Sequence, residues 1–203
     1  MTLRRPVRPV RAMSAAFAGF QFPPEVILLA VRWYLRYGLS PVATTAGIQA
    51  DEGKLYLCAI KDLWSNRIVG YSIDSRMKAR LAVSALDNAV ARRGDVAGCI
   101  LHSDRGSQFR SRKQQRALTA HGMVGSMGQV GSAGDNAAME SFFALLQKNV
   151  LDRRRWDTRD ELRLAVVTWI ERTYHRRRRQ TRLGRLTPIE FETIIKPAAD
   201  QAA

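Results

Sequence analysis

Three apolar segments near the start of the chain constrain the fold more than any other feature. Residues 42–50 are small and β-branched, and residues 54–63 and 67–75 are apolar and partly alternating, which favours strands. Asp51-Glu52-Gly53 and Ser65-Asn66 separate these segments with residues that favour tight turns. Strands joined by such short turns pair in antiparallel order. The sequence therefore predicts a three-stranded antiparallel meander.

Helical and strand-like segments alternate in the rest of the chain. Leu81, Ala85 and Ala89 recur at helical spacing, and Thr158 and Thr187 are each followed three residues later by a glutamate, as at helix N-termini. In order, we expect a helix at 79–92, strand 98–103, helix 107–121, strand 123–127 and helices at 135–151, at 158–177 and from 187. A meander followed by such alternation predicts an α/β fold. Its mixed sheet has three antiparallel strands, then parallel strands, and is flanked by helices.

Composition limits the number of cores and points to the kind of partner. A chain of 203 residues with 46% apolar residues buries one core. The formal net charge of +15 favours a polyanionic partner, because lysine and arginine displace counterions from phosphates. Nucleic acid is the leading interpretation and an anionic membrane surface the alternative. Cys58 and Cys99 lie in apolar runs and are expected to be free thiols.

The domain organisation predicted from the sequence has three parts. Residues 1–16 are expected to form a basic, disordered leader, and a targeting segment over residues 1–22 is the alternative. Residues 17–41 contain a helix that starts at Pro23-Pro24-Glu25. Residues 42–203 form the main domain, which ends in a basic helix and tail. No apolar run approaches the roughly 20 residues that a membrane-spanning helix needs.

Two carboxylates carry the most chemical information. Asp104 follows the expected strand 98–103, and Glu140 lies on the expected helix that begins near Asp135. Thirty-five residues lie between the two. Carboxylate oxygens are the ligands that Mg²⁺ and Mn²⁺ prefer. A basic protein that brings two such groups together is suited to metal-dependent phosphodiester chemistry.

From about residue 42 to residue 195 the chain resembles the catalytic core of insertion-sequence transposases in the retroviral-integrase superfamily. Five blocks carry the resemblance, in the order and spacing of that family. They are Gly53-Lys54-Leu55-Tyr56-Leu57 with Asp62-Leu63; Arg67-Ile68-Val69-Gly70-Tyr71; His102-Ser103-Asp104-Arg105-Gly106-Ser107-Gln108-Phe109; Asp135-Asn136 with Glu140-Ser141-Phe142-Phe143; and Leu186-Thr187-Pro188-Ile189-Glu190-Phe191.

The resemblance implies a ribonuclease-H-like fold and an Asp, Asp, Glu site that holds two Mg²⁺ or Mn²⁺ ions, with 35 residues between the second Asp and the Glu. Such sites cut the element's DNA ends and join a 3′-hydroxyl to target DNA. Asp104 matches the second aspartate and Glu140 the glutamate. Counting back eleven residues from Leu55 puts the first aspartate on Thr44, where the chain departs from the family. Because a shared carboxylate offsets repulsion between two cations about 4 Å apart, we expect impaired activity. The alternative is a catalytically inactive nucleic-acid-binding remnant.

Other expectations follow from the same resemblance. The partner is DNA, on which the chain assembles as a homo-oligomer, with no membrane partner and no small-molecule cofactor. The location is the cytoplasm of a bacterium, in association with the nucleoid. Asp62 is the best-placed residue to replace the missing metal ligand, since a turn near Asp51 brings it within a couple of residues of Thr44. A structural carboxylate in the core is the other interpretation of Asp62.

Residues 17–40 resemble the opening of a second family of insertion-sequence transposases. In that family the segment leads into a helix-turn-helix, and the continuation is absent after Ser40. We expect that the reading frame joins pieces of two transposases near residues 40–44, and that the junction removed the first aspartate. A helix that packs on the core is compatible with this interpretation.

Several polar residues are candidates for contact with DNA. Gln147 and Lys148 share the helix face of Glu140. Arg105 and Gln108 beside Asp104 are expected to contact phosphate or to position the site. His102 is expected either to contact the metal site or DNA, or to form a hydrogen bond within the core. Two arginine runs are expected either to bind the DNA backbone or to form solvated faces. These runs are Arg153, Arg154, Arg155 and Arg176, Arg177, Arg178, Arg179.

Overall fold

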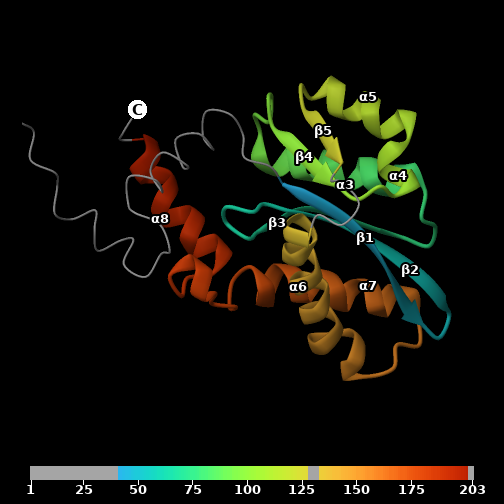
Figure 1. Ribbon diagram of the computed structural model, residues 1–203. Coiled ribbons are helices and arrows are strands. Elements are labelled where there is room, and N and C mark those ends of the chain that lie inside the picture. Colours follow the sequence, from blue (N-terminus) through green and yellow to red (C-terminus); the bar gives the residue numbers. More distant parts are fainter. Residues whose placement is uncertain (1–40, 128–132, 201–203) are drawn as a thin grey trace, which may run out of the picture.

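The computed structural model describes residues 41–127 and 133–200, with the side chains of 41–127 and 137–194. The expected leader at 1–16, and the helix at 17–41 apart from Pro41, lie outside the described residues. The described chain forms one mixed sheet with strand order β3-β2-β1-β4-β5 (Figure 1). The strands are β1 (Val42–Ala50), β2 (Gly53–Lys61), β3 (Ile68–Asp74), β4 (Ile100–Ser103) and β5 (Val124–Met127). β1, β2 and β3 are antiparallel, and β4 and β5 run parallel to β1.

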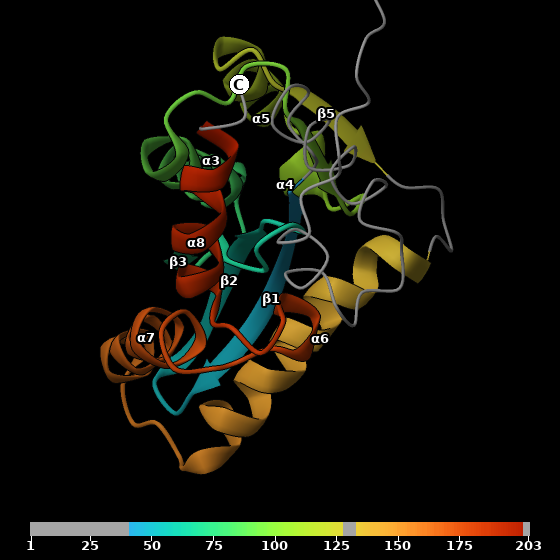
Figure 2. The same ribbon diagram turned by 90° about the vertical axis from the view of Figure 1, so that its left-hand side faces the viewer.

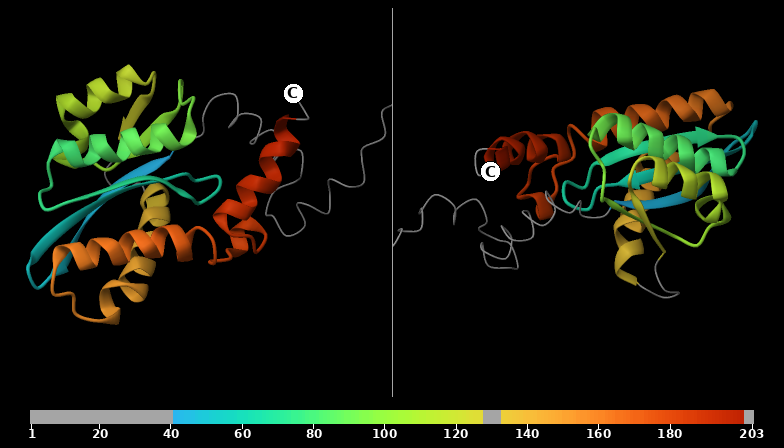
Figure 3. Two further views of the ribbon diagram at one scale, coloured as in Figure 1. Left: turned by 180° about the vertical axis from the view of Figure 1, so that it is seen from behind. Right: turned by 90° about the horizontal axis from the view of Figure 1, so that it is seen from above.

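Helices cover both faces of this sheet (Figures 1 and 2). Helices α3 (Ala79–Arg93), α4 (Ser107–Arg110) and α5 (Arg112–Ala120) lie on one face. Helices α6 (Ala133–Asn149) and α7 (Arg159–Thr168), the latter continued by a π-helical turn at Trp169–Tyr174, lie on the other. Helix α8 (Pro188–Asp200) sits beside the end of the sheet, over neither face (Figure 3). The expected α/β architecture is confirmed.

One expected helix is divided. The chain over 107–121 forms α4 and α5 because Ser111 adopts an extended conformation, with ψ of 146°. The Ser111 hydroxyl accepts a hydrogen bond from the backbone N–H of Gln114 and caps α5. The serine thus gives the backbone an alternative to continued helix. Short 3₁₀ turns at Leu151–Arg153 and Thr181–Leu183 complete the fold.

Two buried clusters, one on each face of the sheet, form the core. On the α6 side, alternate residues of β1 such as Val42 and Ile48 pack with Met139 and Phe142 of α6. On the α3 side, Ala43 and residues of β2 and β3 pack with α3. Adjacent strand residues point to opposite faces, so the two clusters assign each residue of β1 to a side. In the described part of the chain, no helix is long and apolar enough to cross a membrane.

Candidate metal site and nucleic-acid surface

The pairing of β1 with β4 brings Thr44 beside Asp104. Val42 pairs with His102, and Ala43 with Ser103. Continuing this parallel register by one residue sets Thr44 next to Asp104, the first residue after β4. Because Val42 faces α6, the alternation of side chains turns Thr44 to the same face.

Glu140 lies on α6, the helix that covers this face. Its neighbours Met139 and Phe142 are buried against β1, while Glu140 itself is exposed. The start of α6 is also tied to the sheet by Lys61 of β2, whose Nζ donates a hydrogen bond of 3.0 Å to the carbonyl oxygen of Ala138. Thr44, Asp104 and Glu140 therefore come from three elements that meet on one face of the sheet.

A tight turn holds the Asp104 side chain. One of its oxygens, Oδ1, accepts a hydrogen bond of 2.7 Å from the backbone N–H of Gly106. A Cβ at residue 106 would collide with that oxygen and with the end of the Gln108 side chain, so both side chains would have to shift. Gln108 is buried, and its Nε2 donates to Thr45 Oγ1 at 3.3 Å. Of the two roles expected for Gln108, burial favours positioning over contact with phosphate.

Thr44, the position where we expected the first aspartate, carries a hydroxyl and no carboxylate. Its Oγ1 is buried and has no hydrogen-bond partner among the described residues. His102 Nδ1, on the same face, is also buried and has no hydrogen-bond partner among the described residues. The described residues contain no group of three or more His, Cys, Asp or Glu side chains arranged to hold a metal ion. Two carboxylates and a neutral hydroxyl do not fit a bridged pair of divalent cations.

Asp62, the expected replacement ligand, has other partners. It is buried, its Oδ2 lies 2.5 Å from Arg93 Nη2, and its Oδ1 accepts the backbone N–H of Trp64 at 2.8 Å. Arg93 ends α3, on the face opposite to α6. These contacts favour the structural interpretation of Asp62.

The first arginine run lies far from the Thr44 end of β1. The backbone N–H of Asp51 donates to the carbonyl of Trp156 at 2.7 Å, which fixes the run beside the β1–β2 turn. Seven residues of strand separate this turn from Thr44, roughly 23 Å. Arg154 bonds to Glu161 at 2.6 Å and lies over the Trp156 ring. This arginine therefore has a structural role in the turn.

The other candidates for contact with DNA lie closer to the site. The exposed run 176–179 directly follows His175, which is buried against β3. Lys148 is exposed on α6, and Gln147 Nε2 bonds to Asp152 at 2.5 Å. Arg105 is exposed beside Asp104. Direct contact between these residues and DNA stays a prediction.

Lys61 is a residue near the site that the sequence did not single out. It is 5% exposed, although lysine is seldom buried. The available signal was its position as the one charged residue of the run Leu55–Tyr56–Leu57–Cys58–Ala59–Ile60–Lys61. That signal predicts a charged residue at the end of a strand. It does not predict burial, which depends on the position of α6 above the strand.

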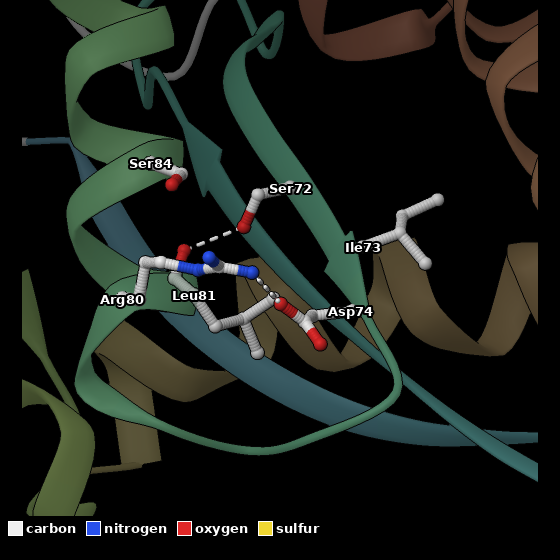
Figure 4. Close-up of a pocket in the computed structure, with 6 residues that line it drawn as sticks. All are labelled: Ser72, Ile73, Asp74, Arg80, Leu81 and Ser84. Atoms are coloured by element: carbon white, nitrogen blue, oxygen red, sulfur yellow. Dashed lines mark hydrogen bonds and ion pairs between the residues drawn. The ribbon is translucent and has the colours of Figure 1, made fainter.

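A pocket elsewhere on the molecule has no link to this face. It is a hollow of about 300 Å³ between the edge strand β3 and the start of α3 (Figure 4). Its polar groups bond to one another: Arg80 lies 2.9 Å from Asp74, and the Ser72 hydroxyl donates to the Leu81 carbonyl at 2.5 Å. The residues that line it are Ser72, Ile73, Asp74, Arg80, Leu81 and Ser84.

Comparison with known proteins identifies the class to which this fold and site belong. Two family models, both described as integrase core domain, match residues 43–133 and 121–188. Transposase InsF of insertion sequence IS3A from Escherichia coli K12 is 40% identical over 145 residues, which cover 71% of this chain and 50% of InsF. An uncharacterized 31 kDa protein of insertion element IS600 from Shigella sonnei is 38% identical over 150 residues, 74% of this chain and 55% of that protein.

Solved structures share the fold at low sequence identity. The catalytic core of BIV integrase has a TM-score of 0.57 at 14% identity, and covers 79% of this chain and 97% of that one. The magnesium-bound catalytic core of HTLV-2 integrase has a TM-score of 0.54 at 16% identity, with coverages of 75% and 94%. A chain of the simian T-cell lymphotropic virus intasome has a TM-score of 0.59 at 17% identity, with coverages of 75% and 53%.

The domain is therefore a ribonuclease-H-like integrase core. Within that class, residues 43–188 belong to the integrase core family together with the insertion-sequence transposases, as the sequence predicted. The chain spans about half the length of the curated relatives that it matches.

Proposed function

We propose that this chain is the core of an insertion-sequence transposase whose metal-dependent cutting and joining of DNA is impaired at Thr44. The observation that carries the proposal is the register of β1 and β4, with Asp104 beside Thr44 and Glu140 on the helix above. The 40% identity to transposase InsF supports the reaction class.

The residues present divide the chemistry between them. Asp104, whose Oδ1 accepts from the Gly106 N–H, and Glu140 would supply oxygen ligands for one divalent cation, Mg²⁺ or Mn²⁺. A bound cation would supply Lewis acidity at a phosphoryl oxygen. Thr44 adds no charge, so the second cation of the family's site lacks its bridging ligand. Impairment follows from that missing charge.

DNA is the proposed substrate, and the basic residues bind its backbone. The net charge of +15 supplies a large, salt-sensitive attraction to phosphates. We infer that the path of the DNA follows the exposed run 176–179 and Lys148, on the side of the sheet that carries Glu140. We also infer assembly of several copies on DNA, in a bacterial cytoplasm at the nucleoid.

Restoring the carboxylate tests the proposal. Thr44→Asp is expected to raise Mg²⁺- or Mn²⁺-dependent joining of a labelled duplex to a plasmid by about ten- to a hundred-fold, or about 1.4 to 2.7 kcal/mol of barrier. Adding Asp104→Asn to Thr44→Asp is expected to return the rate to the parent value. A folded Thr44→Asp variant as inert as the parent would contradict the claim that one missing carboxylate limits activity.

A catalytically inactive DNA-binding module is the second candidate function. It is favoured by the neutral, unpartnered Thr44 hydroxyl and by the lack of a three-ligand cluster among the described residues. In that case DNA binding would be indifferent to Mg²⁺ and unchanged in Asp104→Asn and Glu140→Gln, and Thr44→Asp would restore no joining.

A further inference from the structure

Lys61 is a buried cation that has no counter-charge among the residues the structure describes. Its Nζ donates to the Ala138 carbonyl, a neutral acceptor. Among the described residues, no carboxylate lies within ion-pair distance of it. A buried ammonium satisfied only by a neutral group is electrostatically costly, because desolvation disfavours its charged form. The charge would be stabilised by an anion that approaches from outside.

Two exposed arginines add to the same positive region. Burial, together with the nearby guanidinium groups of Arg182 and Arg178, lowers the pKa of Lys61 to about 8. Nearby like charges disfavour the charged form of a lysine, which is the direction of this shift. Neither arginine forms an ion pair with a carboxylate in the described part of the chain. The cluster therefore has three positive groups and no internal anion.

The backbone that carries the arginines is firmly attached to the sheet. Lys61 pairs with Ile68 of β3, and the Ile68 N–H donates to Nε2 of the buried His175 at 3.1 Å. The Tyr174 hydroxyl donates to the Asn66 carbonyl at 3.1 Å. Arg178 follows His175 by three residues, so it emerges beside the end of β2.

The turn that presents Arg182 is also ordered by specific contacts. Gln180 and Leu186 form a β-bridge, and Gly184 closes the loop between them in a left-handed conformation with φ of 64°. The segment between α7 and α8 lies on the same side of the sheet as α6 (Figure 2). Ordered backbone therefore carries both arginines, on the side of the sheet that carries α6.

We propose that Lys61, Arg178 and Arg182 form a binding site for one backbone phosphate of DNA. The arginines are exposed and meet the phosphate from solvent, and Lys61 supplies charge from beneath. Ala138, which accepts from Lys61, precedes Glu140 by two residues, a rise of about 3 Å along α6. The site thus holds a DNA strand next to the helical turn that presents Glu140. It rests on the proposed function, because it assumes that DNA is the partner.

Salt-dependent DNA binding by the full chain tests this site without any metal. The affinity for a fluorescent 20-base-pair duplex is measured from about 50 to 300 mM NaCl in EDTA. Each phosphate contact contributes about 0.9 to the slope of log K against log salt concentration. Arg178→Gln/Arg182→Gln is expected to lower that slope by about 1 to 2. The matched control Arg112→Gln/Arg116→Gln removes two exposed arginines from α5, on the opposite face, and is expected to keep the parent slope.

Lys61→Met separates binding from structural support. If Lys61 serves a phosphate, its removal weakens DNA binding by about threefold or more. It also raises the midpoint of thermal unfolding of the free protein, because an uncompensated buried charge is gone. If Lys61 only anchors α6, the variant unfolds at a lower temperature and binds DNA as tightly as the parent, which would overturn the proposal.

The outcomes distinguish this site from the proposed function. Equal losses of slope in the Arg178/Arg182 and Arg112/Arg116 variants would reject a defined site while leaving DNA as the partner. A parent protein whose affinity for the duplex is undetectable at 50 mM NaCl would reject both. A loss confined to the Arg178/Arg182 and Lys61 variants supports the site whether or not Thr44→Asp restores joining.

Discussion

His175 shows at the scale of one residue how burial fixes the protonation state of a side chain. The imidazole is 0% exposed, and its Nε2 accepts the N–H of Ile68 while its Nδ1 lies 3.2 Å from Glu171. Burial outweighs the attraction of Glu171 and lowers the pKa of His175 to about 4. A neutral ring is required, because a protonated Nε2 could not accept the bond from β3.

A pH dependence of stability follows. The pKa of His175 is about 4 in the folded state and about 6.5 when unfolded, so the unfolded chain binds more protons between those values. Stability is therefore expected to fall as pH decreases from 6.5 to 4, by up to roughly 3 kcal/mol. Urea unfolding across this range measures it. His175→Gln is expected to be less stable at pH 7 and to show a flatter profile. A His175→Gln profile as steep as the parent's would contradict the assignment.

Residue-level predictions from the sequence rest on local pattern or family motif. Thr44 was placed by counting along a motif, and the β1–β4 register now sets it beside Asp104. The environments of Gln108 and Lys61 were beyond such reasoning, because each depends on an element that is remote in sequence. Whether a lysine at the end of a strand is exposed or buried is decided by α6, nearly 80 residues later.

At the scale of elements, β3 and α3 are packed so closely that glycine is required between them. A Cβ on Gly70 would collide with the carbonyl oxygen of Ala85 and the side chain of Ala89. Helix backbone cannot yield as a flexible side chain does. The alanines of α3 and Gly70 thus allow a close approach that buries this face.

Gly70→Ala is expected to destabilise the protein by about 1 to 3 kcal/mol, because it overpacks the β3–α3 contact. Gly47→Ala in β1 is the matched control, since a Cβ there would lie 3.7 Å from the Tyr56 ring, an ordinary contact. That control is expected to keep or slightly raise stability. The midpoint of urea unfolding, compared at constant slope, gives both values. Equal midpoints for the two variants would contradict this prediction, because they would show that β3 and α3 can move apart without a loss of stability.

Element boundaries were predictable where the chain carries a local signal. The range of β1 agrees with the expected 42–50, and Thr158 and Thr187 cap their helices through the N–H groups of Glu161 and Glu190. The break at Ser111 was missed because a serine interrupts a helix only if its hydroxyl finds the Gln114 N–H, and residues 107–121 are otherwise helix-compatible.

At the scale of the whole molecule, one charged network joins α8 to the rest of the domain. Arg93, at the end of α3, lies 2.5 Å from both Asp62 and Glu192, and Arg67 lies 2.6 Å from Glu192. Trp64 packs edge-on against Phe191 of α8, with ring centroids 5.1 Å apart. Residues of the β2–β3 connection, α3 and α8 meet at this point. No local pattern predicts such a junction, because its members are spread over more than 120 residues.

Removing Arg93 should therefore loosen α8 as well as lower the stability of the core. Arg93→Gln leaves Asp62, whose side chain is only 4% exposed, without its charged partner, an arrangement that costs about 2 to 4 kcal/mol. Hydrogen exchange of the backbone amides of α8 is expected to accelerate more than that of β1 and β2, because the helix is held through this network. Arg80→Gln is the control, since Arg80 pairs with Asp74 in an 80% exposed position and its loss should change stability by less than about 1 kcal/mol. Parent-like exchange in α8 of Arg93→Gln would assign the attachment of the helix to Trp64 and Phe191 instead.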